Sequence, residues 1–188
     1  DSTRIRKIDP QANVTTFAGI GTVGDAGGDL LTEASFNGIN GLAFNPTQTL
    51  IYVSDSLNHR IKRIDIAENK VITLGGTGQP GYINSVYPPY LSEFNNPRDI
   101  VYDPVRGKLY IADSGNHRIR VLEEDIISGP FEPVLVVTVS TLAGTGVNGT
   151  QDGPAATAQF SYPSNIYLDP QSNYLYVSSY AGNKIRRI

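Results

Sequence analysis

The sequence contains no cysteine, no methionine and no tryptophan. Without cysteine there is no disulfide framework, no thiolate zinc site and no cysteine nucleophile, although chains without cysteine occur in every compartment. Without methionine the chain does not begin at a start codon, so we expect a mature segment or a piece of a longer polypeptide. No apolar run approaches the roughly 20 residues that a spanning helix needs, and there is no basic-then-apolar secretory amino terminus. We expect no membrane insertion.

Charge is also sparse, at 18% of residues with a net charge of −3, whereas 39% of the 188 residues are hydrophobic. That content suffices for one good core or two small ones and excludes a disordered tail. The chain carries 19 glycines and 12 prolines, and no apolar face recurs at helical spacing. Many turns and short strands of this kind are typical of sandwiches, barrels and propellers. The sequence therefore predicts an all-β fold.

One unit of sequence recurs along the chain. Residues 50–61 align with 108–119 at a shift of 58, the third copy at 174–185 lies a further 66 residues on, and Arg4–Ile8 reads as the tail of a fourth. A fixed period of this size indicates copies of one supersecondary unit. Separated landmarks obey the same steps, namely Phe36, Phe94 and Phe160, and the turn prolines Pro46, Pro104 and Pro170.

Each unit is predicted to form four antiparallel strands. In the best-preserved unit these strands are Gly41–Phe44, Leu50–Ser54, Arg60–Ile64 and Val71–Leu74. Four such strands make one blade with two apolar faces, and blades bury those faces by packing around a common axis. The predicted architecture is a β-propeller.

The whole of 1–188 is expected to be one propeller segment of about three blade equivalents. Its parts are the end of a blade at 1–20, a blade at 36–78, a blade at 94–145 with a rim insertion at about 123–136, and the first three strands of a blade at 160–188. Because a propeller needs at least about four blades, this segment does not close by itself. Further polypeptide or other copies of the chain must supply the missing arc.

The motifs resemble those of the NHL family, whose repeats carry a Tyr-Val-x-Asp segment, an Asn-His-Arg-Ile segment and a glycine-rich exit. Here they are residues 52–55 and 58–61 and their copies, and the resemblance covers essentially the whole chain. It implies a six-bladed ring. The last unit departs from the pattern, which weakens any role given to the motif there: it has Ser179 for Asp, Gly182 for Asn, Asn183 for His and Lys184 for Arg.

A polar cluster recurs intact in two units. A histidine beside a carboxylate could serve catalysis or bind a metal, but recurrence at the same turn indicates a structural device in which the carboxylate holds the turn between the second and third strands. We expect no catalytic residue, metal or cofactor in this segment. The residues are Asp55, Asn58, His59, Arg60, Asp113, Asn116, His117 and Arg118.

Three glycine motifs match the dinucleotide-binding fingerprint literally. That fingerprint must lie between a strand and a helix, whose amino terminus holds the pyrophosphate, whereas these motifs occur once per repeat before turn residues. We interpret them as connectors between blades. They are Gly19-x-Gly21-x-x-Gly24, Gly76-x-Gly78-x-x-Gly81 and Gly144-x-Gly146-x-x-Gly149.

The third unit has an insertion of about ten residues, because 25 residues separate Ile119 from Gly144 against 15 from Ile61 to Gly76. The insertion is apolar and has no core position to fill. Exposed apolar patches often mark interfaces, so it is the candidate interaction loop, with a tolerated rim loop as the alternative. Its candidate contact residues are Ile126, Ile127, Pro130, Phe131 and Pro133.

Nucleic acid binding is a further alternative, because most of the 15 basic residues lie on third strands. Phosphate binding needs a locally dominant positive field, and the net charge is negative. Alternating charge is typical of an outer strand with one face exposed to solvent. We therefore do not expect nucleic acid as a partner. These basic residues are Arg4, Arg6, Lys7, Arg60, Lys62, Arg63, Arg118, Arg120, Lys184, Arg186 and Arg187.

Asn13-Val-Thr and Asn148-Gly-Thr are N-glycosylation sequons, and a sugar at either would imply an extracellular or cell-surface protein. About two sequons arise by chance in a chain of this composition, so they permit glycosylation without arguing for it. Asp25 and Asp152 lie in glycine turns, but neither loop has the alternating acidic ligands of a calcium loop. Both are expected to be turn formers.

The expected function is that of a non-catalytic scaffold or binding module. Its partner is another protein, further copies of the chain or a carbohydrate, within a larger extracellular or fibrous assembly. Two alternatives stay open: a lyase-like propeller enzyme with active residues on blades outside this segment, and an RNA-binding propeller.

Overall fold

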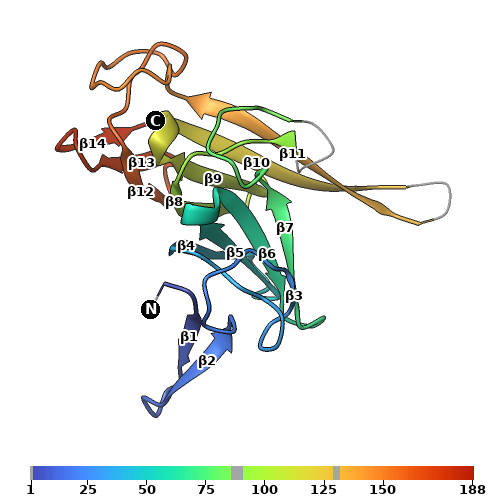
Figure 1. Cartoon of the computed structure of the whole chain (residues 1–188). Coiled ribbons are helices and arrows are strands. Elements are labelled where there is room, and N and C mark those ends of the chain that lie inside the picture. Colours follow the sequence, from blue (N-terminus) through green and yellow to red (C-terminus); the bar gives the residue numbers. More distant parts are fainter. Residues whose placement is uncertain (1, 86–90, 129–131) are drawn as a thin grey trace.

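In the computed structural model, residues 2–85, 91–128 and 132–188 are described. They form antiparallel β-sheets joined by turns and single 3-10 turns, arranged side by side from the amino-terminal to the carboxy-terminal end (Figure 1). No helix among these residues has the length and apolar character that crossing a membrane would require. The prediction of an all-β chain forming part of a propeller is confirmed.

The strands follow the predicted repeat. They are β1 (Ile5–Ile8), β2 (Val14–Ala18), β3 (Gly28–Asp29), β4 (Ile39–Phe44), β5 (Leu50–Asp55), β6 (Arg60–Asp65), β7 (Lys70–Gly75), β8 (Pro97–Asp103), β9 (Lys108–Asp113), β10 (Arg118–Ile127), β11 (Val134–Ala143), β12 (Pro163–Leu168), β13 (Leu175–Ser179) and β14 (Lys184–Arg187). The 3-10 turns η1 (Ser56–Asn58) and η3 (Ser114–Asn116) join the second and third strands of two blades.

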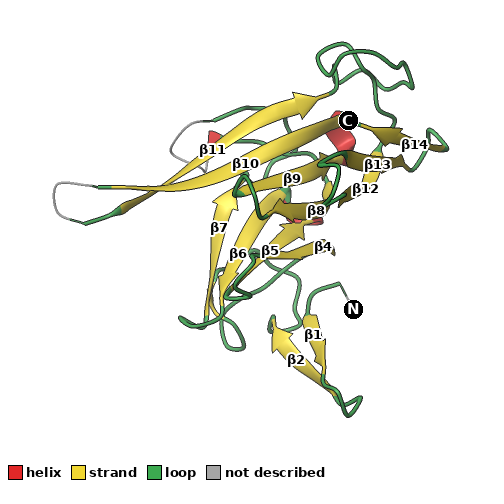
Figure 2. Ribbon diagram, turned by 180° about the vertical axis from the view of Figure 1, so that it is seen from behind, coloured by secondary structure: helices red, strands yellow, loops and turns green. Residues whose placement is uncertain are grey.

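Each blade is a meander in which strands pair in chain order. One sheet runs β4-β5-β6-β7, with the two-residue β3 on the outer edge of β7, and the next runs β8-β9-β10-β11. The flanking sheets are β1-β2 and β12-β13-β14. Strand β8 lies against both β4 and β12, so the first strand of each blade is the innermost one (Figure 2).

The core lies between blades rather than within one. Ile61 and Leu74 of one blade pack with Ile100 and Leu109 of the next, in one of three buried clusters that follow one another along the chain. Both faces of each sheet are therefore apolar, as strands covered on two sides require. Fully burying an isoleucine or leucine contributes about 1.5–3 kcal/mol, so the blades stabilise one another.

The last blade exposes a position that is buried in its neighbours. Ile61 and Ile119 have no exposed surface, while Ile185, the third-strand isoleucine of the last unit, is 76% exposed. The difference follows from packing, because the first two residues face another blade and Ile185 faces none. Within the residues described, no following blade covers the face that carries Ile185.

The expectation that the third strands are solvated outer strands is wrong for β6 and β10. Strand β6 lies between β5 and β7, and β10 lies between β9 and β11. Alternate side chains of an interior strand point into the space between blades, and Lys62 and Arg120 are accordingly fully buried. The outer edge is formed by the fourth strand β11 in one sheet and by β3, beside the fourth strand β7, in the other.

The insertion lengthens two paired strands into a hairpin that projects from its blade (Figure 1). Strands β10 and β11 stay in register out to the pair Ile127 and Val134. Near the hairpin's base, Glu124 is paired with Arg63 of the neighbouring blade. Ile126 and Ile127 are exposed, as is Pro133, whereas the predicted contact residues Pro130 and Phe131 lie outside the described residues.

Candidate functional site

The repeated aspartates end the second strands and are fully buried. Asp113 accepts hydrogen bonds from the Asn95 backbone N–H and the Asn116 amide, each at 2.8 Å, and an ion pair from Arg120 at 2.8 Å. Burial raises the pKa of the Asp113 carboxyl, and the Arg120 guanidinium opposes that shift. Asp55 has the corresponding partners Asn37, Asn58 and Lys62. Because these acceptors are engaged within the protein, the aspartates hold turns rather than face a substrate.

The buried cations also lie against aromatic rings that enter from the connector between blades. The Lys62 ammonium is 5.0 Å from the centroid of the Phe36 ring, and the Arg120 guanidinium is 5.1 Å from that of Phe94. Each cation also donates to the backbone carbonyl of the residue preceding that phenylalanine. Cation, carboxylate, ring and carbonyl form one unit that ties each blade to the connector preceding it.

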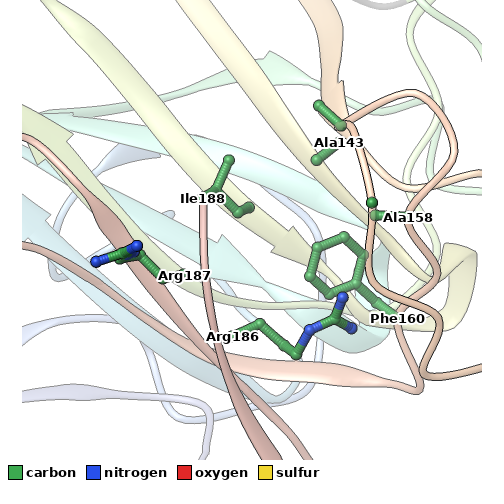
Figure 3. Close-up of a pocket in the computed structure, with 8 residues that line it drawn as sticks. Ala143, Ala158, Phe160, Arg186, Arg187 and Ile188 are labelled. Carbon is green, nitrogen blue, oxygen red and sulfur yellow. The ribbon is translucent and has the colours of Figure 1, made fainter.

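The last blade keeps the cation and the ring but has Ser179 in place of the aspartate. The Arg186 guanidinium lies 5.3 Å from the Phe160 ring centroid and donates to the Gln159 carbonyl at 2.9 Å (Figure 3). Its carboxylate partner is Asp152, which is largely exposed. This blade therefore replaces a buried ion pair with one at the surface.

Two acidic residues that the sequence predicted to be turn formers are ion-pair partners. Asp25 contacts the Arg60 Nε at 2.6 Å and the Lys62 ammonium at 3.3 Å, and Asp152 contacts Arg186. Asp25 and Asp152 do not align with each other in the repeat, so the pattern carried no signal for this role.

Both histidines are held in the left-handed backbone region, with φ near 54°. The His59 Nδ1 accepts a hydrogen bond from the Asn96 N–H at 3.0 Å, and the His117 Nδ1 accepts one from the Tyr162 N–H at 3.2 Å. Each bond joins one blade to the start of the next. Because Nδ1 accepts only when it carries no proton, both imidazoles must be neutral.

Stability is expected to fall as the pH drops below about 6.5, the ordinary pKa of histidine. Burial lowers the pKa of both histidines, and the nearby Arg118 adds to the effect on His117. The unfolded chain then binds protons before the folded one, so the stabilisation is complete above the unfolded pKa and is lost as the pH decreases. Urea unfolding at pH 7.5, 6.5 and 5.5 measures this slope.

The matched control is the double variant His59→Asn and His117→Asn. Asn183 occupies the same position in the last unit with φ 49°, so asparagine fits this backbone. The variant should lose the histidine contribution to the slope, whereas the buried carboxyls of Asp55 and Asp113, whose pKa values burial raises, contribute in both proteins. Equal slopes in the two proteins would contradict the assignment.

The repeated arginine and the glycine connectors form another joint. Arg60 donates to the carbonyls of Gly76 and Thr77 at 3.0 and 3.2 Å, and Arg118 donates to that of Thr145 at 2.6 Å. The first two glycines of each motif have positive φ. Turns and short bridges, not a helix, follow each motif among the residues that the structure describes. The arrangement of a nucleotide fingerprint is therefore not present in those segments.

Both sequon asparagines are accessible. Asn13 and Asn148 are exposed, and the Asn13 amide donates to the Asp9 carboxylate at 2.9 Å. Outside the gaps at residues 1, 86–90 and 129–131, no group of three or more histidine, aspartate or glutamate side chains is placed to hold a metal ion.

These blades and joints define the class of protein, a segment of a β-propeller. An NHL-repeat family model matches residues 94–122. The Arabidopsis thaliana protein SUPPRESSOR OF QUENCHING 1, chloroplastic, is 30% identical over 158 residues, which are 83% of this chain and 14% of that protein. Human NHL repeat-containing protein 2 is 35% identical over 106 residues, or 48% of this chain and 14% of the relative. The chain belongs to the NHL-repeat family and spans a small part of the length of these relatives.

Among solved structures, an auxiliary nutrient binding protein from Bacteroides thetaiotaomicron superposes with a TM-score of 0.72 at 19% identity. The match covers 100% of this chain and 43% of that one. At this identity the likeness shows the fold alone. Together with the family match, it supports a partial propeller built from NHL repeats.

Proposed function

We propose that the chain is a non-catalytic assembly module that binds protein through the open face of its last blade. The observation that carries the proposal is Ile185, a core position exposed at 76% where its two counterparts have no exposed surface. Exposed Tyr167 and Ile185 lie with half-buried Tyr176 around a surface hollow on this blade. A blade face of this composition suits another blade, supplied by further polypeptide or by a second copy.

The engagement of the repeat motif supports a non-catalytic role. Each aspartate is saturated with donors, and each histidine Nδ1 is bonded to backbone, so neither is poised to move a proton to or from a ligand. Lys62 and Arg120 are buried, so these two of the third-strand basic residues cannot contact nucleic acid phosphates.

Light scattering after size exclusion tests the proposal. The 188-residue chain is expected to show a mass above its monomer mass of 20.3 kDa, rising with concentration. Ile185→Glu should restore the monomer, because a carboxylate buried against an apolar face without a partner is strongly disfavoured. A monomer at every concentration would exclude a second copy of this chain as the partner of the blade face.

The projecting hairpin provides the matched control. Ile126 and Ile127 are 71% and 48% exposed, so the double variant Ile126→Glu and Ile127→Glu removes a second apolar surface of comparable exposure. If the blade face makes the contact, this variant should associate as the unmodified chain does. If it alone restores the monomer, the interface lies on the hairpin and the blade-face assignment is wrong.

A further inference from the structure

Arg98 differs from most other arginines of the chain, because no acceptor contacts its guanidinium among the residues described. It is the second residue of the innermost strand β8, and its Nε is shielded from solvent without a hydrogen-bond partner. The next residue, Asp99, does not pair with it, since that carboxylate accepts from the Ile100 and Ile166 backbone N–H groups at 3.0 Å. A half-buried cation is thus left without a counter-charge.

The equivalent side chain in the preceding blade is satisfied. Asn40 donates to the Gly38 carbonyl at 3.2 Å and to the Ser56 hydroxyl at 2.8 Å, both within its own blade. Arg98 instead reaches the following blade, where its guanidinium lies 5.3 Å from the centroid of the Tyr180 ring. A guanidinium stacked on an aromatic face keeps its N–H edges directed outward, where they match a carboxylate or phosphate.

Two tyrosines stand here where the other units have small or polar residues. Tyr180 replaces Ser56 and Ser114 and is 72% exposed; Tyr162 replaces Gly38 and Asn96 and is 41% exposed. The backbone N–H of Tyr180 donates to the Tyr162 carbonyl at 2.9 Å, so both residues project from the same point of the blade.

The backbone of Tyr162 is strained as well. Its φ is 50°, in the left-handed region that Gly38 and Asn96 adopt more easily. Such strain concentrates at ligand sites. Its ring packs edge-on against His117, with centroids 4.5 Å apart, and the His117 Nδ1 bond to Tyr162 leaves the Nε2–H as a donor.

From these observations we infer that Arg98, Tyr162 and Tyr180 form a binding site for an acidic sugar. Arg98 pairs with the carboxylate or phosphate, the tyrosine rings cover the apolar face of the sugar ring, and the phenol and imidazole groups bond its hydroxyls. One unpaired guanidinium matches one anionic group, whereas a nucleic acid strand needs a row of cations. None of these three residues lines the hollow around Ile185.

Isothermal titration calorimetry of the 188-residue chain tests the inference with glucuronate, glucose 6-phosphate, glucose and inorganic phosphate. Glucuronate or glucose 6-phosphate should bind at least about tenfold more tightly than glucose, because only the charged sugars engage the guanidinium. The tighter of the two charged sugars identifies whether carboxylate or phosphate is preferred. Inorganic phosphate should bind weakly, because it has no ring for the tyrosines.

The variants separate recognition of the charge from recognition of the ring. Arg98→Gln should weaken the charged sugars by about 10- to 100-fold and leave glucose unchanged. Tyr180→Ser and Tyr162→Asn restore the residues of the other units and should weaken charged sugars and glucose alike. Arg187→Gln is the matched control, because Arg187 also lies over an exposed tyrosine, Tyr174, at 4.5 Å, and it should change nothing.

Several results would overturn the inference. The first two are that neither charged sugar binds, or that Arg98→Gln binds the charged sugars as tightly as the unmodified chain does. The others are that inorganic phosphate binds as tightly as the charged sugars, or that a single-stranded RNA oligonucleotide binds more tightly than the charged sugars. Unfolding curves confirm that each variant is folded. None of these outcomes bears on self-association, which Ile185→Glu tests independently.

Discussion

Replacing Asp113 with alanine is expected to lower the free energy of unfolding by about 3–5 kcal/mol. The substitution leaves the fully buried Arg120 guanidinium without its carboxylate, and it also strands the Asn116 amide and the Asn95 N–H. Urea unfolding of the 188-residue chain measures the loss. A change within about 1 kcal/mol would show that this ion pair does not hold the turn between β9 and β10.

Two further variants test whether the buried ion pair between Asp113 and Arg120 is the cause of this loss. Asp113→Ala combined with Arg120→Met should be more stable than Asp113→Ala alone, because an apolar side chain needs no buried counter-charge. Ser179→Ala, at the corresponding position of the last blade, should change stability by only about 0.5 kcal/mol, since no buried pair depends on that residue. Equal losses for Asp113→Ala and Ser179→Ala would contradict this account.

Gly76→Ala should be the second large effect, with a loss of about 2–5 kcal/mol. Gly76 has φ +104°, and a Cβ there would overlap the His59 carbonyl oxygen and come within 2.9 Å of the Arg60 Cα. Both neighbours are backbone and cannot yield as a flexible side chain would. The substitution therefore strains the turn and separates the connector from β6, which thermal and urea unfolding would detect.

Gly107→Ala separates the effect of backbone strain at a positive φ from the effect of steric overlap of the new Cβ. Gly107 also has a positive φ, +67°, but the nearest atom to a Cβ there would be the Tyr102 hydroxyl at 3.9 Å. Only the conformational penalty applies, about 1 kcal/mol. If both variants lost the same amount, close approach of the connector would not be the reason for glycine at position 76.

Much of the fold could be predicted from the repeat. Residues 50–61 align with 108–119, and the second and third strands of the two units pair in the same register. Alternation along each strand predicts that both blade faces are apolar, but it does not say which neighbour lies on which face. For that reason the buried Lys62 and Arg120 were assigned to a solvated strand.

The candidate binding site was less predictable. Arg98 lies outside the repeated motif, and Tyr162 and Tyr180 interrupt the pattern in the unit that departs most from it. In the sequence, those departures only make the last unit less similar to the other repeats. Only the packing of one blade against the next brings a cation from β8 over a tyrosine that lies 82 positions later in the chain.

The all-β class, the number and order of strands in a blade, the connectors and the positions of the repeated polar residues could be predicted from the sequence, because these depend on local patterning and turn chemistry. The packed blades were needed to show which charges are buried, which core position is left exposed and which residues of neighbouring blades meet. Those properties depend on contacts between blades, and a period in one chain specifies the blade but not the environment that its neighbours create.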